Sequence, residues 1–411
     1  MIPIVLCNGL GVDSEPLKSF NNEEIANLKI YERTLLNLAQ EGFDQAALVS
    51  DIDKIYFKRL RRKFPDFKII QSRTFDHLVK ENDLLIIQNN VVLNKKQLQS
   101  IFAIIQNTDR SFKTVSDSND GVIFLKNGFA IELENNLTNL KKISENIDEF
   151  KLDDPPKKLS INELGTNVGR DFLFDHISKN VSGWFSKRVN SKISIPISKI
   201  LIKVNIHPNI ITFFVGLIGI SCGFFYAWHM PLAGALILQL ATILDRCDGE
   251  VARIKLKESV FGQWFDTALD QISYFSMFVG ISMCMNNPKY FLFTYDHILY
   301  KQLSILNILL YLIFLTTILF FMLRRTKNGS LAYYPSEVDK IVPMKSRSFI
   351  YKAMSKCRFL LKREFFSPAM IHVILIGYET ATILTTVFLL GGLIHQTCDY
   401  AALRKKIDIT Y

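Results

Sequence analysis

The chain has 411 residues, of which 49% are hydrophobic and 21% are charged, and this length predicts two or three domains. Its formal net charge of +10 does not indicate nucleic-acid binding, because the basic residues cluster beside long apolar runs, as in cytoplasmic loops of membrane proteins. The six cysteines show no paired spacing, which argues against a disulfide framework and against a zinc site.

Residues 1–155 predict a soluble α/β domain with a parallel sheet. Short apolar runs suited to buried parallel strands lie at residues 2–6, 45–49, 67–70 and 84–87. Amphipathic segments suited to helices alternate with them, at residues 30–38, 52–62, 75–80 and 95–105. No basic residue precedes the first apolar run, so we expect it to form a strand and not a signal peptide.

Residues 156–204 predict a linker followed by a helix at the membrane surface. The segment Asp153–Lys158 contains two prolines and should interrupt regular structure. Residues 171–204 then interleave Lys and Arg with aromatic residues such as Trp184 and Phe185, a pattern typical of amphipathic interfacial helices. An ordinary soluble helix is the alternative, but the apolar runs that follow favour the interface.

Residues 205–402 predict an all-α membrane domain with six transmembrane helices, followed by a cytoplasmic tail at 403–411. The expected spans are residues 208–228, 231–253, 263–286, 300–323, 367–382 and 384–401. The last two are divided by Tyr378-Glu379-Thr380, which interrupts a long apolar stretch. An even number of spans places both termini and the basic loops in the cytoplasm, as the positive-inside rule requires.

Four aspartates occur at helical spacing on two consecutive expected spans. Asp245 and Asp248 are three residues apart, and Asp266 and Asp270 are four apart, so each pair shares one face of its helix. Chance charges at a solvated helix end could explain the first pair but not the second, which opens an apolar run. Four carboxylates at membrane depth would repel one another without a cation. Oxygen ligands at this density suit Mg²⁺ or Mn²⁺, and two such ions could clamp a pyrophosphate.

Small residues accompany these acids on both helices. Gly249 and Ala252 continue the first acidic face, and Gly262 lies one turn before Asp266. We expect them to let the two helices approach closely and to leave room for a ligand beside the carboxylates.

This segment resembles the signature of the CDP-alcohol phosphotransferase family. The family pattern D-x-x-D-G-x-x-A-R, eight residues, then G-x-x-x-D-x-x-x-D is matched from Asp245 to Asp270 without a substitution. The segment from Pro208 through Asn209 to Thr212 also looks like the family's P-N-x-x-T. The similarity covers about residues 171–402.

The resemblance implies a two-metal transferase that acts on a CDP-alcohol donor and an alcohol acceptor. It implies that Asp245, Asp248 and Asp266 bind the metals and that Asp270 completes the site and deprotonates the acceptor. The CDP group would contact the first two aspartates and a set of further residues, namely Asn209, Thr212, Gly249, Ala252, Arg253 and Gly262. It also suggests a homodimer in the lipid bilayer, with the active site open to the cytoplasm.

A basic stretch before the expected fifth span could bind a phosphorylated acceptor or a lipid headgroup. Its candidate residues are Arg358, Lys362 and Arg363. Anchoring of a cytoplasmic loop by positive charge is the alternative.

The N-terminal domain resembles sugar-phosphate nucleotidyltransferases, in an architecture similar to fused inositol-phosphate cytidylyltransferase/di-inositol-phosphate-phosphate synthases. The loop Leu6–Gly11 looks like the glycine-rich phosphate loop of that family, and Lys18 could serve as its lysine. However, Asp13 stands where the family has an arginine, and Asn89-Asn90 stands where it has a metal-binding Gly-Asp. We therefore predict a degenerate domain without catalysis. An enzyme that also makes its own CDP-alcohol from CTP, and an inactive membrane binding protein or scaffold, are the alternatives.

Overall fold

The computed structural model describes residues 2–6, 19–50, 57–72, 83–116, 119–126, 147–179, 186–204, 206–285, 297–326, 329–342, 366–371 and 377–409. Contacts divide the chain into two compact units, which are described separately. Unit 1 comprises Met1–Ile177 and Ile254–Leu256, and unit 2 comprises Ser178–Arg253 and Lys257–Tyr411.

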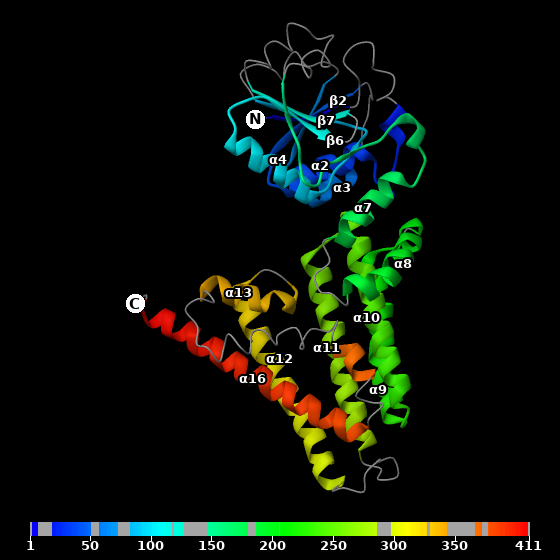
Figure 1. Ribbon diagram of the computed structural model, residues 1–411, viewed down its shortest axis with the longest axis vertical. Coiled ribbons are helices and arrows are strands. Elements are labelled where there is room, and N and C mark those ends of the chain that lie inside the picture. The colour runs from blue at the N-terminus through cyan, green and yellow to red at the C-terminus, as the bar shows by residue number, and fades with distance from the viewer. Residues whose placement is uncertain are drawn as a thin grey trace. The chain divides into compact units, whose positions relative to one another are not determined.

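Unit 1 is an α/β domain whose described strands form a seven-stranded sheet in the order β3-β2-β1-β4-β7-β6-β8 (Figure 1). Its parallel part consists of β1 (Ile2–Leu6), β2 (Gln45–Val49), β3 (Lys68–Ser72) and β4 (Leu84–Gln88). Strand β7 (Asn119–Leu125) runs antiparallel to β4 and to β6 (Phe112–Ser116), and β8 (Asp148–Phe150) is parallel to β6. The sheet is therefore mostly parallel, as predicted, and among its described strands only β7 pairs antiparallel with its neighbours.

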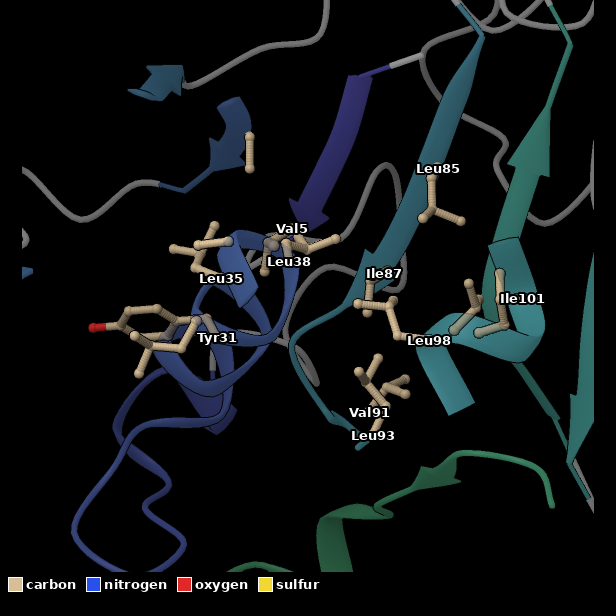
Figure 2. Close-up of a cluster of buried hydrophobic side chains, with 14 of the residues drawn as sticks. Val5, Tyr31, Leu35, Leu38, Leu85, Ile87, Val91, Leu93, Leu98 and Ile101 are labelled. Atoms are coloured by element: carbon tan, nitrogen blue, oxygen red, sulfur yellow. The ribbon is translucent and has the colours of Figure 1, made fainter. Parts of the chain in front are cut away.

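The apolar runs of the sequence form the core of this sheet. Residues Leu84–Ile87 are all 0% exposed, as expected for a strand that is covered on both faces. Helices α2 (Ile30–Gln40) and α4 (Lys95–Asn107) contribute Leu35 and Ile101 to the cluster that contains Val5 and Ile87 (Figure 2). Asn94 caps α4 in a capping box: its side chain accepts from the Gln97 backbone N–H, and the Gln97 side chain accepts from the Asn94 backbone N–H.

Several expected elements of unit 1 differ in their bounds. The helix predicted at 52–62 is observed as α3 (Lys58–Lys63), while residues 51–56 and the helix predicted at 75–80 lie outside the described residues. The expected linker is partly regular, since β9 (Lys157–Lys158) pairs antiparallel with β5 (Val91–Val92). Unit 1 also contains two short 3-10 helices, η1 (Phe20–Asn22) and η2 (Ile161–Glu163). Most of α7 (Val168–Lys179) belongs to unit 1 as well. Unit 1 thus continues beyond the predicted boundary at 155.

Unit 2 is helical in all its described parts. A π-helix, Ser186–Asn190, leads into α8 (Ser191–Lys203). The long helices are α9 (Pro208–Ala227), α10 (Pro231–Ile254), α11 (Val260–Cys284), α12 (His297–Arg325) and α16 (Tyr378–Ile409), with η5 (Leu331–Tyr333) and α13 (Tyr334–Ile341) after α12. Figure 1 shows α9, α10 and α11 alongside one another, whereas α12 packs with α16.

Three of the described helices are long and apolar enough to cross a membrane: Pro208–Ala227, Ile298–Arg325 and Tyr378–Arg404. Helices α10 and α11 have 24 and 25 residues, but the acids of the signature lower their hydropathy. Six spans therefore remain a prediction. The expected last span, 384–401, lies within α16, which begins at Tyr378 after Gly377 with φ 144°. The helix includes Glu379 because a carboxylate is favourable in a first turn.

Candidate metal centre

The signature aspartates come together between α10 and α11. Asp245, Asp248 and Asp266 each offer a carboxylate oxygen, and these oxygens all lie within 4.8 Å of one another. Asp245 and Asp248 share a face of α10, and Asp266 lies almost two turns into α11. Ser259 caps α11, because its side chain accepts from the Gly262 N–H. Helical spacing predicted that each pair of aspartates shares one face of its helix, and the family resemblance implied that Asp245, Asp248 and Asp266 belong to one metal site.

Helix α9 supplies a hydrogen bond to this cluster. His207 caps the helix by accepting from the Asn209 N–H, and Pro208 occupies its first turn, where a missing N–H has no consequence. One turn later, buried Thr212 Oγ1 donates to Asp248 Oδ2. The threonine of the P-N-x-x-T segment thus orients a carboxylate of the centre, as partners of metal ligands commonly do.

Asp270 lies near the cluster but not within its group of three. It lies one turn after Asp266 on the same face of α11. The neighbouring Gln271 accepts from the Tyr311 hydroxyl of α12, through its side chain at 2.8 Å and through its carbonyl at 3.0 Å. Asp270 therefore lies beside the group of three, on a stretch of α11 that contacts α12.

Of the small residues beside the acids, Gly249 leaves room, whereas Gly262 is in tight contact with the side chain of Asn209, and neither brings two helix backbones together. A Cβ added to Gly249 would meet only Arg253, at 3.4 Å from the ends of its flexible, exposed side chain. A Cβ on Gly262 would lie 3.1 Å from Asn209 Oδ1 and from Ser259 Oγ. Ala252 is partly exposed on the same side as Gly249. Gly249 and Ala252, two of the residues named for the CDP group, thus line space next to the carboxylates.

The close contact is made elsewhere, between α9 and α11. A Cβ on Gly223 would meet Ser276 O at 2.3 Å, and one on Gly280 would meet Gly223 O at 2.2 Å, so the two backbones touch. Gly216 and Gly219 contact side chains of α11, those of Leu269 and Ser273. Glycines at such spacing let membrane helices approach closely. The G-x-x-x-G at residues 219–223 is a sequence signal that could have predicted this contact.

The carboxylates fit a hard divalent cation. Asp266 Oδ1 is buried and has no hydrogen-bond partner among the described residues, although a buried acceptor without a partner is costly. Carboxylates this close also repel one another. An oxygen-only donor set of this kind suits Mg²⁺ or Mn²⁺.

Other predicted residues lie apart from the centre or outside the described residues. The candidate acceptor residues Arg358, Lys362 and Arg363 lie outside them, as do Asp13 and Lys18. In unit 1, Asn89 and Asn90 are buried at the end of β4. Their amides donate to Asn21 Oδ1 at 2.6 Å and to Leu159 O at 3.0 Å. These two asparagines hold neighbouring segments, a structural role that the sequence did not reveal.

Comparison with known families identifies the helical segment that carries this centre. Residues 205–341 match the family model of CDP-alcohol phosphatidyltransferase. This confirms the resemblance seen in the signature, and the segment is a domain of that family.

Curated relatives agree with this assignment. One is "Bifunctional IPC transferase and DIPP synthase" of Archaeoglobus fulgidus, 40% identical over 102 residues, which are 24% of this chain and 20% of the relative. The protein of the same description from Aquifex aeolicus is 34% identical over 101 residues, 25% of this chain and 23% of the relative. "Archaetidylinositol phosphate synthase" of Pyrococcus horikoshii is 33% identical over 100 residues, 23% of this chain and 53% of the relative. The chain thus spans between 20% and 53% of the length of these three relatives.

Among solved structures, a Bacillus anthracis protein described as a glucose-1-phosphate thymidylyltransferase matches with a TM-score of 0.30 and 8% identity. The match covers 45% of this chain and 97% of that structure. A score this low supports no inference about unit 1.

Proposed function

We propose that this chain is a membrane transferase that moves a substituted phosphate from a CDP-alcohol to an acceptor alcohol, with release of CMP and formation of a phosphodiester. The observation that carries the proposal is the convergence of Asp245, Asp248 and Asp266 within a segment that matches the CDP-alcohol phosphatidyltransferase family. The names of the relatives point to phospholipid or polyol phosphodiester products.

The aspartates hold the reacting groups. Two Mg²⁺ or Mn²⁺ ions bound by Asp245, Asp248, Asp266 and Asp270 would offset the charge of the pyrophosphate and of the transition state. Asp270 accepts the proton of the acceptor hydroxyl, whose oxygen then forms a bond to phosphorus while the bond from phosphorus to the CMP oxygen breaks. Its position beside the group of three, and not inside it, suits this role.

The residues around the aspartates bind the donor and the acceptor. Gly249 and Ala252 leave space for the CDP group, and Gly262 contributes to its site beside Asn209. The exposed Arg253 guanidinium provides a permanent charge for the phosphate. Asn209 and Thr212 complete this part of the site from α9. For the acceptor, Arg358, Lys362 and Arg363 provide the positive charge that a phosphorylated alcohol or a lipid headgroup requires.

The protein works as a multi-pass membrane homodimer in the lipid bilayer. Three apolar helices and the family match support membrane insertion. The distribution of Lys and Arg favours six spans, with both termini and the active site facing the cytoplasm.

The first experiment measures CMP release by the purified full-length protein with Mg²⁺ or Mn²⁺. CDP-diacylglycerol and CDP-inositol are offered against a panel of alcohols that includes inositol phosphate and glycerol phosphate. We expect release that depends on the metal and is lost in Asp270→Asn. No release from any pair by folded, Mn²⁺-bound protein would instead favour a binding or scaffold role, against which the intact signature now argues.

A bifunctional enzyme that also makes the CDP-alcohol from CTP is the second candidate, because two of the relatives are described as bifunctional. Asn89 and Asn90 argue against it, since neither carries the charge that holds a metal and both amides are used in internal hydrogen bonds. Full-length protein incubated with CTP and sugar phosphates, including inositol phosphate, should release no pyrophosphate. Release would show that unit 1 is catalytic.

A further inference from the structure

Helix α10 has a second polar face, which the proposed chemistry does not use. Glu250 lies on this face and is 0% exposed. Ser194 and Ser198 of α8 donate to its two carboxylate oxygens, Oε1 and Oε2, each at 2.7 Å. Arg246, one turn earlier on α10, lies 3.6 Å from Glu250 Oε1. A buried carboxylate between two serine hydroxyls and an arginine ties α10 to α8.

The contact continues along α8. Arg246 donates to Ser186 Oγ and, at 3.2 Å, to Ser191 Oγ. Ser191, Ser194 and Ser198 lie three and four residues apart and are at most 4% exposed, so they form one buried side of α8, here called the serine face. Cys247 adds a weak Sγ contact to Ser194 O at 3.6 Å.

This face of α10 lies opposite the aspartates. With 3.6 residues per turn, the mean direction of Arg246, Cys247 and Glu250 lies roughly 180° from the mean direction of Asp245 and Asp248. A rotation of α10 by about 10° would move a carboxylate at the helix surface by about 1 Å. Metal-binding groups must be held within about 0.5 Å of their working geometry. Whatever fixes the rotation of α10 about its axis therefore also decides whether the aspartates can share a cation.

We propose that Glu250 is a positioning residue: held by the serine face of α8 and by Arg246, it fixes the rotation of α10 and so places Asp245 and Asp248 for metal binding with Asp266. The inference rests on the proposed function in that it concerns the same metal centre. Glu250 occupies a variable position of the signature, so the family pattern assigns it no role.

The test measures Mn²⁺ binding to full-length protein in detergent by isothermal titration calorimetry, well below the unfolding temperature, with CMP release measured in parallel. The key variant is Ser194→Ala/Ser198→Ala, which removes both donors but no metal ligand. The matched control is Ser221→Ala, because the Ser221 hydroxyl bonds the Ile218 carbonyl of its own helix at 2.7 Å. Glu250→Gln keeps the length of the side chain, and its amide can bond both serines, so it is the conservative variant.

We expect the dissociation constant for Mn²⁺ to rise at least tenfold in the double variant, the range seen when partners of metal ligands are removed. It should rise less than threefold in Glu250→Gln and stay within twofold in Ser221→Ala. If the double variant does not fold, Ser198→Ala alone should raise the constant at least threefold.

Unchanged Mn²⁺ affinity in the folded serine variants would overturn the inference even if their unfolding temperature falls, because a purely structural contact affects only stability. Wild-type protein that binds no Mn²⁺ would overturn it too. The wild-type protein could bind Mn²⁺ without releasing CMP, while the serine variants bind Mn²⁺ more weakly. That result would support the role of Glu250 and contradict the proposed transferase activity.

Discussion

The close contact between α9 and α11 predicts that an alanine in place of Gly280 destabilises the protein, by an amount that follows from the distances at this contact. In Gly280→Ala, the new Cβ would lie 2.2 Å from the carbonyl oxygen of Gly223. Ordinary contacts begin at 3.4 Å, so the two helices would have to separate by 3.4 − 2.2 = 1.2 Å. Neither side can yield by a side-chain rotation, because the oxygen belongs to the backbone.

Three effects then combine. Overpacking of this kind costs about 1–3 kcal/mol. The bond from Ser276 Oγ to Ile220 O, now 2.7 Å, would lengthen to about 3.9 Å and be lost, at a cost of about 0.6 kcal/mol for a membrane helix pair. The better helix propensity of alanine offsets about 1 kcal/mol. We therefore expect a net destabilisation of about 1–3 kcal/mol.

The matched control is Gly391→Ala in α16, where an added Cβ would meet nothing within 4 Å. Only the propensity gain of about 1 kcal/mol applies there, so this variant should be stabilised. Unfolding of both variants in detergent, followed by far-UV circular dichroism, should separate them by roughly 2–4 kcal/mol. Equal unfolding midpoints for the two alanine variants would refute the close approach of α9 and α11.

The other predictions concern the metal centre and unit 1. Asp266→Asn should lower CMP release at least a thousandfold. Without metal its unfolding temperature should be no lower than that of wild type, because the repulsion between Asp266 and Asp248 is removed. Thermal unfolding in EDTA and in Mn²⁺ checks this, and only wild type should gain stability from Mn²⁺. Thr212→Val, which deletes the hydroxyl that bonds Asp248, should weaken Mn²⁺ binding about tenfold in a calorimetric titration, and unchanged affinity would contradict its orienting role. The hydrogen bond from the Ser160 backbone N–H lowers the pKa of Glu163 in the folded state. Glu163 therefore stabilises the folded state at pH values above its pKa in the unfolded chain, and this contribution is lost as the pH falls through its folded pKa. Below about pH 4.5, the free energy of unfolding of Glu163→Gln should depend less on pH than that of wild type.

The parts of unit 1 that the sequence predicted are those in which local pattern and burial agree. Continuous apolar runs mark β1, β2 and β4 because parallel strands are covered on both faces. Strands β6 and β7 were not predicted, since the pairing of β7 with β4 joins segments that are distant in the chain, and polar residues such as Lys113 interrupt the apolar residues of β6. The mostly parallel sheet was therefore predicted, whereas its antiparallel strand β7 was not.

The candidate site divides in a similar way. Spacing along each helix predicted the faces on which the aspartates lie, and the resemblance to the family signature implied that Asp245, Asp248 and Asp266 come together. The glycine contact between α9 and α11 depends on which faces meet, and spacing within one helix does not determine that. The sequence placed the close approach at Gly249 because this residue adjoins the acids, whereas the backbones meet at Gly223 and Gly280.

Helix α8 shows why the Glu250 contact was not predicted. Hydrophobic periodicity assigns apolar residues to the buried side of a helix, but α8 has the reverse arrangement: its serine face is buried, while Ile193 and Ile200 are 44% and 64% exposed. The reversal is expected where a helix has lipid on one side and a charged helix on the other, because lipid accepts isoleucine and a buried carboxylate requires hydroxyl donors. For a helix beside a membrane, small polar residues at a spacing of three and four therefore indicate the protein-facing side. By this rule the serines at 191, 194 and 198 predict a buried charged partner, and Glu250 is that partner.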